Sequence, residues 1–161
     1  MSSQHPRRRT LPEELFRGLA SFQELEGRIA HLPEELERGD ALEVFVEAYL
    51  WLTPLCQVQD LWLVGQIPLD VRTTLNLPSD QKGVDGAFRT RTGTLVPYQV
   101  KHRIGRPKVG VTEVATFLGL TERATDRVLI SNCDHYAKDI ENRDHLRLIT
   151  GTDFDTLTAA D

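Results

Sequence analysis

Residues 83–103 contain two strand-forming runs, and the turn between them restricts how the chain can fold. The runs are Val84–Thr90 and Thr94–Arg103, separated by the sequence Thr-Arg-Thr-Gly at residues 90–93. Gly93 occupies the place in this turn where a positive φ costs a glycine little. The order predicts an antiparallel β-hairpin.

Polar residues in this hairpin are spaced so that they can meet at one point. Asp85 lies within Gly-Val-Asp-Gly at residues 83–86, and the second strand carries Tyr-Gln-Val-Lys at residues 98–101. Side chains alternate between the faces of a strand, so Gln99 and Lys101 share one face. If the hairpin places Asp85 beside Gln99, a carboxylate, an amide and an ammonium group come together.

This combination suits metal-dependent hydrolysis of a phosphodiester. The reaction needs a hard cation that stabilises the phosphate and supplies hydroxide, and Mg²⁺ prefers oxygen ligands. Asp85 offers a charged oxygen, Gln99 its side-chain carbonyl and Val100 its backbone carbonyl. Lys101 can donate hydrogen bonds to the attacking water and to phosphate oxygens.

The two strand motifs resemble those of the PD-(D/E)xK restriction-endonuclease-like superfamily, in particular its Mrr-type branch. Glutamine commonly replaces the second acid in that branch, although this removes one formal charge. The resemblance also implies a glutamate on the preceding helix, in a pattern Gly-x-x-apolar-Glu. Residues 39–43, Gly-Asp-Ala-Leu-Glu, match it, which makes Glu43 the fourth site residue. The implied cofactor is Mg²⁺ or Mn²⁺.

Glu43 has a second interpretation, because an N-cap Asp40 with Glu43 three residues later would form a capping box. The helical geometry around Leu42 places Glu43 roughly 90° from the centre of the apolar stripe and Glu47 roughly 130° away. We therefore expect Glu43 to border the buried side and Glu47 to face water.

The remaining pattern predicts an α/β protein with a mixed central sheet flanked by helices. The resemblance covers about residues 38–158 and implies an α-β-β-β-α-β core. With the polar, basic residues at the start of the chain, we expect three parts: a disordered basic lead at 1–10, a helical extension at 11–37 and a nuclease domain at 38–161. Before the hairpin, we expect helices over 11–30 and from about 33 or 40 to 52, then one or two strands within 58–69 and an irregular insertion at 70–82. After the hairpin, we expect a helix from 112, a strand at 128–131 and a short helix capped by Asp134 that ends near 141. A strand at 146–149 and a helical turn at 152–154 complete the expected elements.

The formal net charge of −5 is unlike that of a domain that holds DNA by overall electrostatics. A DNA partner would have to meet a local basic patch. One run qualifies, although it can also be only a solvated loop: Lys101, His102, Arg103, Arg106 and Lys108. Arg7–Arg9 can add a phosphate contact or belong to a mobile tail.

Two cysteines without a metal-ligand or disulfide spacing indicate a reducing compartment, and no apolar run is long enough to cross a membrane. We expect a cytoplasmic protein without membrane contact. The chain contains no GxxxxGK[ST] phosphate loop. Members of the family often work beside a helicase or ATPase motor, which would then lie outside this sequence.

Three functions fit the sequence. The first is a metal-dependent DNA endonuclease domain of a restriction or phage-defence system, and since double-strand cleavage usually needs two active sites, it is compatible with a homodimer or a partner subunit. The second is a catalytically inactive DNA-binding or assembly module of the same fold, which the glutamine at position 99 and the acidic charge favour. The third is a structure-specific or RNA-directed nuclease.

Overall fold

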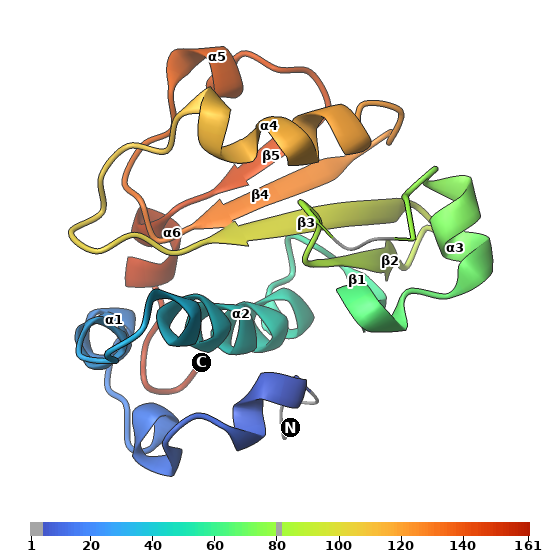
Figure 1. The fold of residues 1–161 in the computed structure, drawn as a ribbon. Coiled ribbons are helices and arrows are strands. Elements are labelled where there is room, and N and C mark those ends of the chain that lie inside the picture. The colour runs from blue at the N-terminus through green and yellow to red at the C-terminus, as the bar shows by residue number, and fades with distance from the viewer. Residues whose placement is uncertain (1–4, 80–81) are drawn as a thin grey trace.

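The computed structural model describes residues 5–79 and 82–161, and its centre is a five-stranded mixed sheet (Figure 1). The strands lie in sequence order across the sheet. The first two neighbouring pairs are antiparallel and the last two are parallel. This confirms the predicted α/β class and the mixed sheet. The strands are β1 Val58–Leu63, β2 Gly86–Thr90, β3 Leu95–Lys101, β4 Arg127–Ser131 and β5 Leu146–Ile149.

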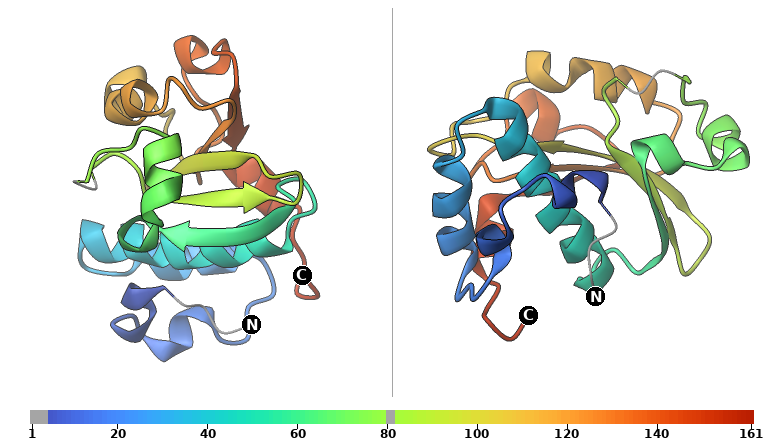
Figure 2. Two further views of the ribbon diagram at one scale, coloured as in Figure 1. Left: turned by 90° about the vertical axis from the view of Figure 1, so that its right-hand side faces the viewer. Right: turned by 60° about the horizontal axis from the view of Figure 1, so that its bottom comes forward.

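Helices cover both faces of the sheet (Figures 1 and 2). The long helix α2, Glu35–Leu52, lies under one face beside α1, Phe22–Ala30. The opposite face carries α4, Val111–Leu120, and α5, Lys138–Glu141. The other elements are α3 Leu69–Thr74, α6 Gly151–Asp155 and three short 3₁₀ helices, η1 Pro6–Arg9, η2 Glu13–Phe16 and η3 Val64–Gln66.

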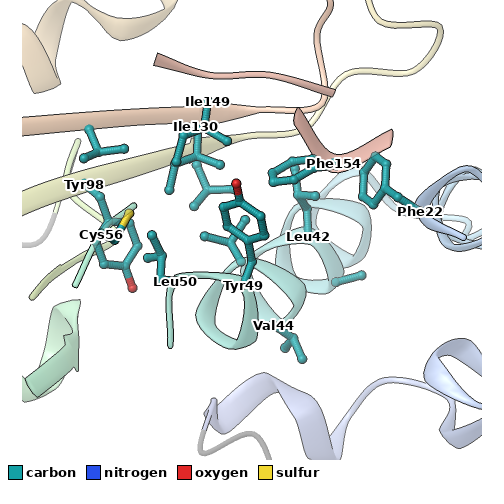
Figure 3. Packing of buried hydrophobic residues seen from close by; sticks show 14 of the residues in the cluster. Phe22, Leu42, Val44, Tyr49, Leu50, Cys56, Tyr98, Ile130, Ile149 and Phe154 are labelled. Atoms are coloured by element: carbon teal, nitrogen blue, oxygen red, sulfur yellow. The ribbon is translucent and has the colours of Figure 1, made fainter. Parts of the chain in front are cut away.

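The strands separate two apolar layers by alternating their side chains. On β4, Val128 and Ile130 pack into the cluster below the sheet, whereas Leu129 packs into the cluster around α4. Figure 3 shows the lower cluster, where Leu42 and Tyr49 of α2 lie between the sheet and the helix. This layer holds α2 firmly against the strands that carry the site.

The β2–β3 hairpin is confirmed where the sequence predicts it. Gly93 adopts a φ of +90°, and the Thr90 amide bonds to the Thr94 carbonyl across the turn at 2.9 Å. A left-handed residue is needed here, and glycine adopts this conformation without a Cβ clash.

The N-terminal region differs from the expectation. The single helix predicted from residue 11 is wrong, because Gly18 turns the chain with a φ of +63° and separates η2 from α1. Ser21 then caps α1 by accepting from the Glu24 amide at 3.2 Å. In the expected disordered lead, Pro6–Arg9 form η1 and His5 is buried.

Other boundaries also move. Helix α2 starts at Glu35, so it crosses the division expected between residues 37 and 38. The strand that begins at Val58 ends at Leu63, and the stretch expected to be irregular contains most of helix α3. The N-cap of α5 is Ala137 rather than Asp134. Within residues 5–79 and 82–161, no helix combines the length and apolar character needed to cross a membrane.

Candidate active site

The carboxylate of Asp85 reaches the second strand of the hairpin through an irregularity at the start of β2. Gly86 pairs with Tyr98, yet the Asp85 amide also donates to the Tyr98 carbonyl, at 3.0 Å. Two residues thus oppose one, as in a β-bulge, which turns a side chain away from the regular alternation. The backbone of Asp85 is therefore opposite Tyr98 rather than Gln99. Its Oδ2 accepts from the Val100 amide at 2.7 Å, between Gln99 and Lys101 in the chain.

Gly86 is required beside this aspartate. A Cβ at Gly86 would lie 2.6 Å from the Trp62 carbonyl and would overlap the ring of Tyr98. The Tyr98 ring thus crosses the neighbouring strand where the glycine leaves room. The Gly-Val-Asp-Gly motif consequently has a packing reason for its last residue as well as a chemical reason for its acid.

The surroundings of the Asp85 carboxyl favour its protonated form. Burial and then the nearby charge of Glu43 raise its pKa from 3.8 to about 7. The Val100 amide, Lys101 and His5 oppose this rise. A divalent cation would act in the same direction as these three groups, because positive charge stabilises the carboxylate.

Glu43 comes from α2 and contacts the N-terminal segment. It lies in the interior of α2, whose capping box is formed by Glu34 and Glu37, so the capping box expected at Asp40 and Glu43 is wrong. Its Oε2 is instead 3.2 Å from Nε2 of His5, and its carboxylate remains 29% exposed. The charge of Glu43 raises the pKa of Asp85, so the two carboxylates are near enough to interact.

Glu47 does not face water as the helical geometry predicted, since it is only 5% exposed. The prediction assumed that one side of α2 is solvated. The N-terminal segment also packs against α2, and Figure 3 shows Val44 of this helix pointing toward it, away from the sheet.

Gln99 and the Val100 carbonyl provide neutral oxygens near Asp85. Gln99 is 5% exposed, and its Oε1 is buried without a hydrogen-bond donor among the described residues. The N–H and C=O of a strand residue point to the same edge, so the Val100 carbonyl shares the edge on which its amide meets Asp85. An unsatisfied buried oxygen is costly, and either a water molecule or a cation would supply the partner that it lacks.

Lys101 ends β3 and is half-buried. Its charge lowers the pKa of Asp85 and also that of Glu113, at the start of α4. The ammonium group therefore acts on both sides of this end of the strand.

These residues fit a divalent cation with oxygen ligands. Within the described part of the chain, no three His, Cys, Asp or Glu side chains are grouped as a metal site. Two carboxylates, from Asp85 and Glu43, have to be supplemented by Gln99 Oε1 and the Val100 carbonyl. Such an all-oxygen set suits Mg²⁺ or Mn²⁺ and leaves positions for water.

Some residues of the basic run at the end of β3 and after it are held in ion pairs within the protein, and others could contact a phosphate. Arg106 is bound to Glu26, Asp134 and Asp155 and is 14% exposed, so its guanidinium is not directed at a ligand. Arg103 forms an ion pair with Glu113.

The other members of the run differ in charge and exposure. Burial, together with the charges of Arg38 and Arg103, lowers the pKa of His102 to about 4, which leaves it neutral at pH 7. Lys108 is exposed. Lys101 and Lys108 are therefore the best placed of the predicted phosphate contacts.

No sequence pattern predicted a role for His5, which lies 38 positions from its partner Glu43. Its neighbours resemble a polar tail, and no motif or period connects the two residues. The available signal was that a basic segment precedes a chain with several acids on its long helix.

Comparisons with known proteins support the fold. No protein-family model and no curated protein sequence matches the chain. Among solved structures, it is similar to part of one described as the ATP-dependent Type ISP restriction-modification enzyme LlaBIII bound to DNA, with a TM-score of 0.58 and 21% identity. The match covers 81% of this chain and 8% of the other. The two share a fold.

Proposed function

We propose that this chain is a nuclease domain of the PD-(D/E)xK type, Mrr-like branch, that hydrolyses DNA phosphodiesters with Mg²⁺ or Mn²⁺. The observation that carries the proposal is the Asp85 carboxylate bonded to the Val100 amide, between the buried Gln99 and Lys101. The likeness to a segment of a DNA-bound restriction-modification enzyme supports it. A role in restriction or phage defence, beside a motor domain, is part of the proposal.

Each residue has a defined task in this reaction. Asp85, Glu43, Gln99 Oε1 and the Val100 carbonyl would hold the cation, which supplies charge stabilisation at the phosphate and a nucleophile near neutral pH. Lys101 donates hydrogen bonds to the attacking water and to a phosphate oxygen. Glu43 is also placed to accept a hydrogen bond from water at the exposed side of its carboxylate.

DNA would approach along the end of β3 and the loop that follows it. Lys101 and the exposed Lys108 provide positive charge there, in a chain whose net charge is −5. Backbone contacts of this kind give affinity without sequence information. We therefore propose DNA cleavage without assigning a recognition sequence.

Supercoiled plasmid tests this function directly. The purified protein should nick it with Mg²⁺ or Mn²⁺ and not in EDTA, and both Asp85→Ala and Lys101→Ala should abolish nicking. Two matched controls, Asp60→Ala on β1 and Lys138→Ala on α5, remove an acid and a lysine from partly or fully exposed positions. Cleavage that persists in the Asp85 and Lys101 variants would refute the site.

A non-catalytic DNA-binding module remains the second candidate. It is favoured by the neutral Gln99 and by the absence, in the described residues, of a three-acid metal cluster. This function predicts plasmid binding in a gel-shift assay without nicking under any metal. Duplex, branched and single-stranded DNA and RNA substrates, compared in the same assays, identify the nucleic acid that is bound or cut.

A further inference from the structure

The N-terminal segment of residues 5–10 packs along α2, beside the candidate site. Figures 1 and 2 show η1 lying against the side of α2 that faces away from the sheet. Two polar contacts join the segment to one stretch of α2: His5 Nε2 is 3.2 Å from Glu43 Oε2, and Arg7 Nη1 is 3.7 Å from Asp40 Oδ2. A segment that looks like a tail in the sequence is thus attached to an acid of the proposed metal site.

The hydrogen bonds of His5 define which ring nitrogen carries the proton. Its Nδ1 accepts from the Arg7 amide at 3.2 Å, so Nδ1 carries no proton and its lone pair is engaged in this bond. The proton of the neutral ring is then on Nε2, which donates to Glu43 Oε2. The imidazole itself is only 6% exposed, so the donor is held in place by its surroundings.

This contact restricts one oxygen of Glu43 and leaves the other. With Oε2 bound to His5, the rotation of the carboxylate is limited and Oε1 remains for a cation or its water. Outer partners that orient a metal-binding side chain typically change metal affinity or activity by about 10- to 100-fold when they are removed.

We propose that His5 is a positioning residue of the active site: its Nε2–H orients the Glu43 carboxylate for the metal. The inference rests on the proposed nuclease function and adds a residue that the strand and helix motifs do not contain. It makes the η1 segment part of the catalytic unit.

The test compares His5→Ala with His5→Gln, because glutamine can place an N–H donor where histidine has Nε2. Mn²⁺ affinity is measured by calorimetry, plasmid nicking is measured against Mg²⁺ concentration, and melting temperature is recorded. His5→Ala should weaken Mn²⁺ binding about 10- to 100-fold, and His5→Gln should recover most of this loss. His31→Ala, which removes an exposed histidine on α1's C-terminal side, should match wild type.

A double-variant comparison separates positioning from packing. In a Glu43→Ala background, His5→Ala should cause no further loss of Mn²⁺ affinity, since its effect passes through Glu43. Because His5→Gln fills much of the same space, it keeps the test valid if His5→Ala fails to fold. Equal loss of Mn²⁺ affinity in both His5 variants, or an additive loss in the Glu43→Ala background, would overturn the inference.

The two proposals fail in different ways. An active, metal-binding wild type together with an unchanged His5→Ala variant overturns the role of His5 alone. A wild type that neither binds Mn²⁺ nor nicks plasmid overturns the nuclease function, and the positioning role with it.

Discussion

Two clusters of charged residues, one around Arg106 and one around Asp85, both combine acidic and basic side chains but differ in whether the protein itself pairs the charges. Arg106 binds Glu26 through Nε at 2.9 Å and Asp155 through both terminal nitrogens at 2.7 Å, with Asp134 at 3.2 Å. Hydrogen bonds, first to Asp155, raise the pKa of Arg106 despite its burial. The protein itself satisfies these charges, and the cluster fastens α1, α6 and the loop after β3 to one another.

At the candidate site, like charges are close together. Burial and Glu43 raise the pKa of Asp85, and Gln99 Oε1 has no donor among the described residues. A cation bound here would stabilise the ionised form of Asp85. The two clusters therefore differ in how the protein treats its charges: the acids around Arg106 are paired by the protein itself, whereas the raised pKa of Asp85 is what motivates the proposed metal site.

The substitution with the largest expected effect is Asp85→Asn, which tests whether the acid of the candidate site is needed for nicking. The amide oxygen can still accept from the Val100 N–H, so the fold is kept while the charge is lost. Plasmid nicking should fall about 1000-fold or more, because metal stabilisation of the phosphate is worth several kcal/mol. Nicking within tenfold of wild type would show that Asp85 does not hold the metal.

The pH dependence of stability, measured without any metal, should reveal the raised pKa of the Asp85 carboxyl. The folded Asp85 carboxyl has its pKa raised to about 7, above the 3.8 of an ordinary aspartate. As pH rises from about 4 to about 7, the unfolded chain loses this proton first, which favours unfolding. In EDTA, wild type should therefore lose stability relative to Asp85→Asn over this range, on the order of 3 kcal/mol.

Chemical denaturation of both proteins at several pH values measures this difference. Groups other than Asp85 are common to the two proteins and largely cancel. Mg²⁺ should oppose the loss above pH 7, since it favours the ionised carboxylate. A difference that does not vary with pH would mean that Asp85 ionises as in the unfolded chain.

Mutation of Arg106 should lower stability and leave nicking intact, which is the reverse of what we expect for Asp85→Asn. Arg106→Met leaves Glu26, Asp134 and Asp155 without their shared cation, and removing one partner of a buried ion pair costs about 3 kcal/mol. Nicking per folded molecule should be retained. Urea unfolding measures the loss, and Arg123→Met, at an exposed arginine, serves as control. Lost nicking with unchanged stability would place Arg106 at the DNA instead.

Sequence patterns predicted the parts of the fold that depend on local chemistry. The hairpin, the buried strand at β4 and helix α2 follow from a turn glycine, an apolar run and helical spacing. The start of α1 did not follow, although Gly18 and the Ser21 cap set it locally, and the burial of His5 did not follow because it depends on the N-terminal segment packing against α2. Such long-range contact has no periodic signature.

The candidate site likewise has features that the sequence predicted and features that only the structure shows. Asp85, Gln99 and Lys101 belong to neighbouring positions of one hairpin, so the sequence predicted that they approach one another, but it did not predict the bulge that aims Asp85 at the Val100 amide. Arg106 was predicted as a phosphate contact from its basic neighbours alone. Its three acidic partners come from distant parts of the chain, and only the structure brings them to it.

The smallest expected effect distinguishes the two halves of the basic run. Each phosphate contact contributes about one counterion to the salt dependence of DNA binding. Lys108→Ala should therefore reduce the slope of log affinity against log salt by about 1, whereas Arg106→Met should leave it unchanged. Fluorescence anisotropy in EDTA measures binding without cleavage, and Lys138→Ala is the matched control. A slope that changes with Arg106 and not with Lys108 would reverse the assignment, because it would mean that the ion pairs of Arg106 open when DNA binds.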